Sequence, residues 1–280
     1  PGPRAAGEDG RVSVGWLATG RDQAADNLLS DVVARAQRDE GPLDIGAVFC
    51  DRERGESPES DRFLDLVARL GIPAVTLSSR AGWAEAQRHG VSRTEWRNAY
   101  HRSVAELLIP YNLGVLVMAG YMLIASPEMC RRFAILNLHP ALPGGPKGMW
   151  QQVIWDLLEE EAEETGAMIH LATAQLDRGP VVSLFRFPLR GPDWDPLWDQ
   201  WRAKRAVRSV AEIAAEEGED EPLVAEIRRR GEVREIPLLY HTLRQFAESR
   251  LNTANGSVFA ASTRLPLDLT AEVDAEVERR

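Results

Sequence analysis

The sequence is poor in cysteine, has no long apolar run and has no excess of positive charge. Its 280 residues include two cysteines, Cys50 and Cys130, so neither a disulfide framework nor a cysteine metal cluster is expected. Both lie in apolar surroundings, which is typical of buried thiols in a reducing cytoplasm. No signal peptide or run of membrane-spanning length is visible, and we expect a cytoplasmic protein without a membrane partner.

The charge balance is acidic, with 43 Asp and Glu against 33 Lys and Arg, a net charge of -10 and a pI near 5.1. This balance argues against nucleic acid as a main partner, because the phosphate backbone attracts basic surfaces. An anionic small molecule is still compatible with it, since a local pocket can be positive. The 44% of hydrophobic residues is ordinary for a globular protein with a sizeable core.

Strand-like and helix-like patterns alternate along the first half of the chain. The expected strands are residues 12–20, 43–50, 71–77 and 113–118, and the expected helices include 26–33, 61–70 and 100–109. Residues 78–99 are polar and include Trp83 and Trp96. This alternation predicts an α/β fold, a Rossmann-like and mostly parallel sheet with helices on both faces.

The pattern changes beyond residue 190, where a helical C-terminal elaboration is expected. Trp194, Trp198 and Trp201 recur at helical spacing and indicate a packing stripe. Further helices are expected at 209–217, 222–230 and 236–246, followed by a hairpin turn at Asn255-Gly256. We therefore divide the chain into a disordered segment (1–10), one α/β domain (11–250, with the helical elaboration at 190–250), and a C-terminal hairpin and tail (251–280) that frays from Ala271.

Two polar side chains stand at the end of an apolar strand. Asn137 and His139 alternate with Leu136 and Leu138, so a period of two places them on the same side of the strand. The following prolines and glycines end the strand and hold an open loop. An amide and an imidazole in this position are suited to polarising a carbonyl group and moving a proton.

A second strand-like stretch, residues 168–173, leads into a turn that carries Asp177. The Asp177 carboxylate is placed where it could face His139, and His170 is expected to be a core histidine that lines the pocket. The motif Asn-x-His-Pro-x-Leu and the later Leu-Asp-x-Gly-Pro-Val, with residues 117–122 and Ser126-Pro127, resemble the folate-dependent formyltransferases. The resemblance is to the glycinamide ribonucleotide formyltransferase group. It covers roughly residues 12 to 190, with a weaker echo near 234 to 246, and it implies a loop and a helix start within residues 78–99.

The resemblance implies catalytic roles for Asn137, His139 and Asp177. Asn137 would donate a hydrogen bond to the oxyanion of the tetrahedral intermediate, and His139 would bind that oxygen or carry a proton. Asp177 would orient the imidazole and favour its protonated form. The co-substrate implied is 10-formyltetrahydrofolate, and no metal is expected.

The resemblance also implies two binding surfaces. The residues expected to bind the folate are Met118, Gly120, Tyr121, Met122, Leu123, Ile124, Ala172, Thr173 and Leu176. The residues expected to bind a phosphorylated amine are Thr19, Gly20, Arg21, Pro140, Lys147 and Gly148. The phosphate would bind backbone amides where the first strand turns into its helix.

The sequence departs from the family pattern mainly on the amine side. A longer loop, residues 19–28, replaces the glycine-rich Gly-x-Gly-Ser-Asn-Leu turn. Leu123 stands where the family has arginine, Arg178 stands where it has glycine, and the segment 190–233 is longer. We therefore expect the formyl donor to be as in the family, and the identity of the acceptor is less constrained by the sequence.

The function expected is formyl transfer to a primary amine, with glycinamide ribonucleotide in purine biosynthesis as the first choice. Alternatives are a formyltetrahydrofolate hydrolase, transfer to an amino sugar or specialised metabolite, and a non-catalytic folate-binding relative. About ten residues precede the first strand, which counts against the hydrolases, since these carry an N-terminal regulatory domain. A nicotinamide oxidoreductase is disfavoured because no Gly-x-Gly-x-x-Gly follows the first strand. A homodimer is compatible with the sequence.

Overall fold

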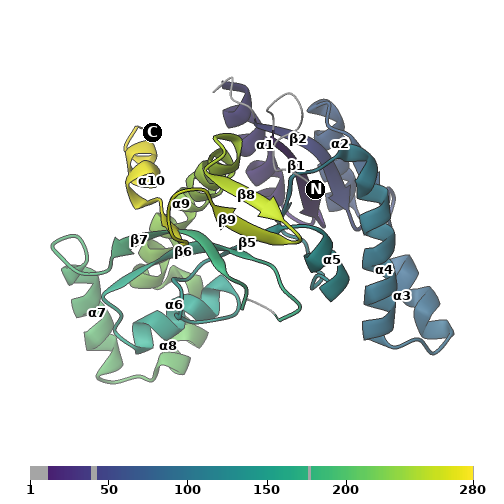
Figure 1. The fold of residues 1–280 in the computed structure, drawn as a ribbon. Helices are drawn as coiled ribbons and strands as arrows, with labels where there is room; N and C mark the ends of the chain where they lie inside the picture. Colours follow the sequence, from purple (N-terminus) through teal and green to yellow (C-terminus); the bar gives the residue numbers. More distant parts are fainter. Residues whose placement is uncertain (1–11, 39–42, 176–177, 280) are drawn as a thin grey trace. The chain divides into compact units, whose positions relative to one another are not determined.

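The computed structural model of the chain (Figure 1) describes residues 12–38, 43–175 and 178–279. These residues form two compact units. Of these residues, the first unit comprises 12–38, 43–137, 170–175, 178–180 and 242–265. The second comprises 138–169, 181–241 and 266–279. The N-terminal segment 1–10, which we expected to be disordered, lies outside the described residues.

The first unit is built on a parallel sheet with the strand order β3-β2-β1-β4-β5. The strands are β1 (Val12–Ala18), β2 (Leu43–Cys50), β3 (Ala74–Thr76), β4 (Val115–Met118) and β5 (Ile135–His139), of which β5 ends in the second unit. β1 pairs in parallel with β2 and β4, β2 pairs with β3, and β4 pairs with β5. Strands β2 and β3 lie on one side of β1, and β4 and β5 lie on the other, so the strand order reverses between β1 and β4. In open α/β sheets, ligands bind at such a point, outside the carboxyl ends of the strands.

Helices cover the two faces of this sheet. They are α1 (Gln23–Arg38), α2 (Pro58–Arg69), α3 (Ser79–Arg88), α4 (Arg93–Leu108) and α5 (Pro127–Arg132), with a 3₁₀ turn η1 at Ile109–Tyr111. Leu17, Phe49 and Leu116 form one core cluster with residues of α4 and α5, whereas α1 and α2 pack together and contact β2. The predicted mostly parallel sheet with helices on both faces is confirmed.

Local capping signals explain why residues 78–99 are more regular than we expected. Ser78 caps α3 by accepting a hydrogen bond from the Ala81 N–H group. Ser92 and Glu95 form a reciprocal capping box at the start of α4. The predicted polar loop is therefore mostly two helices, which lie beside each other in Figure 1.

The second unit contains the strands β6 (Glu164–Leu171), β7 (Val181–Pro188) and β10 (Leu267–Asp268) in that order, of which β6 ends in the first unit. Its helices are α6 (Trp150–Glu159), α7 (Asp195–Arg205), α8 (Val210–Glu216), α9 (Pro222–Ala247) and α10 (Thr270–Val277), with a 3₁₀ turn η2 at Gly218–Asp220. The packing stripe is confirmed, because Trp194, Trp198 and Trp201 are at most 2% exposed. The hairpin at Asn255-Gly256 is also confirmed and joins β8 (Leu251–Ala254) to β9 (Ser257–Ala260) in the first unit.

Two predictions for the C-terminal region were wrong. The two helices expected at 222–230 and 236–246 are the single helix α9, which continues through Pro237. Apolar residues of both halves are buried, including Ile227 and Leu238, and this burial offsets the hydrogen bond that proline removes. The tail that we expected to fray from Ala271 forms the helix α10. An ion pair between Arg234 of α9 and Asp274 of α10, at 2.9 Å, joins the two helices.

Candidate active site

A cavity of about 300 Å³ opens in the first unit, beside the end of β4 and Asn137 of β5. Its lining consists of Met118, Tyr121, Met122, Leu123, Ile124, Ala125, Asn137, His170, Ala172 and Thr173. Seven of the nine residues predicted to bind folate are in this lining; Gly120 is not, and Leu176 lies outside the described residues. The lining is mostly apolar, with Asn137 and His170 as its main polar side chains, and this suits a flat heteroaromatic ring.

Asn137 and His170 are joined inside this lining. The Asn137 Nδ2 and His170 Nε2 atoms are 3.2 Å apart, and His170 Nδ1 lies 3.0 Å from the Leu171 carbonyl oxygen. Because a carbonyl oxygen only accepts, Nδ1 carries a hydrogen, and in the neutral tautomer Nε2 accepts from the Asn137 amide. One amide hydrogen thus orients Asn137, and the second is available to a ligand in the cavity. The prediction that His170 is a core histidine lining the pocket is confirmed.

The segment Tyr121–Ala125, here called the cavity wall, is held partly by a histidine that the sequence analysis missed. The His101 Nδ1 atom accepts a hydrogen bond from the Ser126 N–H group at 3.1 Å, and Nε2 lies 3.0 Å from the Tyr121 hydroxyl. His101 is fully buried in α4, and burial, with a smaller effect of Arg97, lowers its pKa to about 4. A single histidine in an amphipathic helix carries no local signal of this role.

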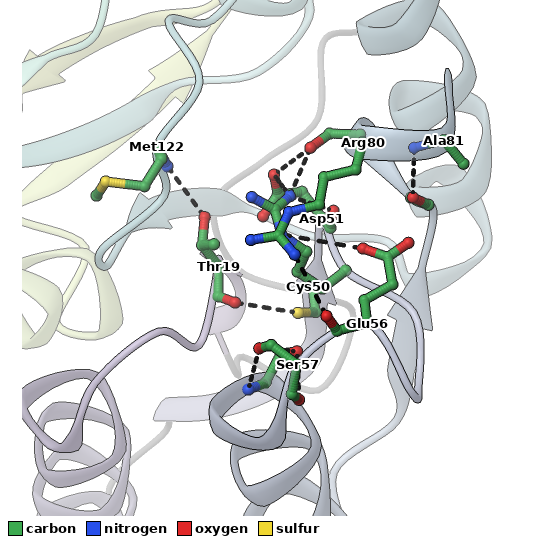
Figure 2. A network of polar contacts seen from close by, with 12 residues as sticks. Thr19, Cys50, Asp51, Glu56, Ser57, Arg80, Ala81 and Met122 are labelled. Atoms are coloured by element: carbon green, nitrogen blue, oxygen red, sulfur yellow. Dashed lines mark hydrogen bonds and ion pairs between the residues drawn. The ribbon is translucent and has the colours of Figure 1, made fainter. Parts of the chain in front are cut away.

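The loop predicted to bind a phosphate makes contacts of its own. The Thr19 N–H group donates to the Gly120 carbonyl oxygen at 3.3 Å. The Thr19 hydroxyl accepts from the Met122 N–H group at 3.2 Å (Figure 2). The neighbouring Gly20 is buried. Arg21 is exposed and pairs with Asp22, whose carboxylate also accepts from the Ala25 N–H group at 3.0 Å and so caps α1. This cap places a negative charge at the start of the helix.

His139 lies in the second unit, at the end of β5. It is 3% exposed, and its Nε2 atom donates to the Pro146 carbonyl oxygen at 3.1 Å. Pro140 lines a small cavity of about 20 Å³, room for about one water molecule, whereas Lys147 and Gly148 are exposed.

The structure describes two of the three predicted catalytic residues, and these two belong to different units. Asn137 lies in the first unit and His139 in the second, and Asp177 lies outside the described residues. Their convergence stays a prediction.

Within the described ranges, 12–38, 43–175 and 178–279, no three His, Cys, Asp or Glu side chains gather in a metal-binding group. None of the helices in this part of the chain combines the length and apolar character of a membrane span.

The sequence of this chain is similar to those of known formyltransferases. The sequence profile of a family described as formyl transferase matches residues 27–189. A phosphoribosylglycinamide formyltransferase of Mycobacterium tuberculosis is 30% identical over 202 residues, which cover 71% of this chain and 82% of that protein. Three other curated proteins with that name match at 29–35% identity, and there the match spans about half of their length, 46–52%.

Solved structures show the same fold at lower identity. Glycinamide ribonucleotide transformylase 1 from Symbiobacterium toebii superposes with a TM-score of 0.60 at 22% identity, covering 90% of this chain and 95% of that one. A formyltetrahydrofolate deformylase from Burkholderia mallei superposes with a TM-score of 0.56 at 17% identity, covering 89% and 70%. The fold is thus shared by structures whose titles name a transferase and a deformylase.

Proposed function

The chain belongs to the formyl transferase family, and we propose that it transfers a formyl group from 10-formyltetrahydrofolate to a primary amine. The observation that carries this proposal is the cavity beside the end of β4, with the Asn137 amide in its lining. Its volume of about 300 Å³ is within the range of small-molecule sites, and its apolar wall suits the pteridine ring of a folate.

Asn137 supplies the hydrogen bond that the reaction needs. The amine nitrogen bonds to the formyl carbon, the carbonyl oxygen becomes an oxyanion, and the bond from that carbon to the folate nitrogen then breaks. A proton leaves the attacking nitrogen and reaches the departing one. The Asn137 N–H group that His170 does not use stabilises the oxyanion, and such a donor typically contributes about 10²–10³ in rate. In this proposal His139 carries the proton and Asp177 holds its imidazole in place.

We propose glycinamide ribonucleotide as the first acceptor to test, because the curated relatives carry the name phosphoribosylglycinamide formyltransferase. One observation favours a second candidate, an amine without a phosphate group. The Asp22 carboxylate caps α1, and the Thr19 N–H group is engaged by Gly120. A carboxylate at this helix start repels a phosphate and competes for the same N–H groups.

The test compares glycinamide ribonucleotide with its dephosphorylated riboside as acceptors, under saturating 10-formyltetrahydrofolate. Release of tetrahydrofolate is measured with each amine, with an amino sugar and with water alone. Preference for the ribonucleotide supports the first acceptor, and equal use of the riboside supports the second. Turnover with water alone identifies a hydrolase, and absence of turnover with every acceptor overturns the proposed transfer.

The Asp22→Asn variant separates the two acceptors further. Removing the negative charge at the start of α1 should raise kcat/KM for the ribonucleotide by roughly threefold to tenfold and leave the riboside unchanged, because only the ribonucleotide carries a phosphate. An equal effect on both acceptors would place the phosphate away from α1.

A further inference from the structure

The cavity wall, Tyr121–Ala125, has almost no backbone support of its own. These residues follow β4 and precede α5, and they belong to neither a helix nor a strand. Within the described part of the chain, the N–H groups of these five residues make one hydrogen bond, from Met122 to the Thr19 hydroxyl at 3.2 Å. The one hydrogen bond from the backbone N–H groups of the wall is therefore accepted by a side chain outside it.

Thr19 is itself rigidly placed. It follows the last residue of β1 and is 4% exposed. Its N–H group donates to the Gly120 carbonyl oxygen at 3.3 Å, and its carbonyl oxygen accepts from Cys50 Sγ at 3.7 Å (Figure 2). A β-branched side chain also has restricted rotation about χ1. The position of the hydroxyl is consequently fixed relative to β1, the strand that lies between β2 and β4 in the sheet.

Figure 2 shows the Met122 N–H group directed at this hydroxyl while the Met122 side chain extends in another direction. That side chain is 49% exposed and belongs to the lining of the cavity. One hydrogen bond thus connects the end of β1 to the surface that a ligand would contact, across 103 positions of sequence.

We propose that Thr19 is a positioning residue for the folate, acting through the Met122 backbone to hold the cavity wall in its binding conformation. This inference rests on the proposed function, since it takes the ligand of the cavity to be a folate. Thr19 does not belong to the lining of the cavity. Thr19 acts on the conformation of the wall before a ligand binds. A preorganised wall binds the ligand more tightly, because less conformational entropy is lost on binding.

The experiment measures binding of 5-formyltetrahydrofolate, a stable isomer of the donor, by titration calorimetry. Thr19→Val keeps the shape of the side chain and removes the acceptor, and we expect its Kd to rise about tenfold, which corresponds to about 1.4 kcal/mol. Thr19→Ser restores the acceptor and should bind within about threefold of the wild type. In turnover assays the valine variant should raise KM for the donor and change kcat by less than about threefold.

Thr253→Val is the matched control. Thr253 is also buried in the first unit, and its hydroxyl donates to the Gly114 carbonyl oxygen at 3.0 Å, away from the cavity lining. This variant loses a comparable hydrogen bond, so it should lower thermal stability and leave the Kd for the folate unchanged. A loss of binding in both valine variants would indicate general destabilisation and overturn the positioning role.

Hydrogen exchange of the Met122 amide makes the test independent of the ligand. Exchange should be slow in the wild type and in Thr19→Ser, and fast in Thr19→Val. If the wild type binds the probe and Thr19→Val binds it equally well, the positioning role is wrong and the proposed function stands. If the wild type does not bind the probe, both proposals fail, and the exchange data still report whether the Thr19–Met122 bond forms.

Discussion

Acidification should weaken the first unit through His101. The imidazole is fully buried beside the Tyr121 hydroxyl and the Tyr100 ring, and its Nδ1 atom accepts from the Ser126 N–H group. Protonation would place a hydrogen on both ring nitrogens. The Nδ1–H group and the Ser126 N–H group would then both be donors, and the hydrogen bond between them would be lost. Burial, with Arg97 as a lesser cause, lowers the pKa of this group from 6.5 to about 4.

The sign and size of the effect follow from linkage. The unfolded chain takes up a proton at His101 below about pH 6.5, whereas the folded chain does so only below about pH 4. The free energy of unfolding therefore falls as the pH is lowered between these values and levels off below them. At about 1.36 kcal/mol per pH unit, the loss due to this histidine is roughly 3 kcal/mol.

The assay is urea unfolding of the wild type and of His101→Asn at intervals from pH 7 to pH 4. Asparagine supplies a neutral oxygen near the position of Nδ1, so the Ser126 N–H group keeps an acceptor and no proton is taken up. We expect the variant to be less stable at pH 7, and its deficit to shrink by roughly 3 kcal/mol by pH 4. Parallel pH profiles for the two proteins would refute the reasoning, because the carboxylates they share would then account for the whole dependence.

Three further predictions concern the site and the fold. Asp177→Asn should lower turnover by about 10² or more with an unchanged circular dichroism spectrum, and near-normal rates would remove Asp177 from the mechanism. Burial raises the pKa of the Cys50 thiol to about 12, so iodoacetamide at pH 8 should label this residue in urea and not in the native protein, as peptide mass spectrometry would reveal. Ser92→Ala removes the capping box with Glu95 and should lower the unfolding free energy by about 1 kcal/mol in a urea titration, where a loss below about 0.3 kcal/mol would contradict the role of this cap.

Much of the scaffold was predictable because its signals are local. The apolar run Leu43–Cys50 matches the bounds of β2, and the alternation of strands and helices indicated the parallel sheet. The side chains of Asn137 and His170 were recognised from their strands, since residue type and strand position sufficed. The single helix α9 was not predicted, because Pro237 is a strong local signal for an end and the burial that overrides it belongs to the tertiary structure.

The sequence by itself determined the alternating architecture, the family and the position of the polar residues at the end of β5. Only the tertiary structure decided how the cavity wall is held, through Thr19 and His101. These two side chains contact wall residues that lie 103 and 20 positions away in the sequence, and a hydrogen bond between distant residues leaves no periodic trace in the chain. Strands and helices follow from neighbours in sequence, whereas the shape of a binding site follows from neighbours in space.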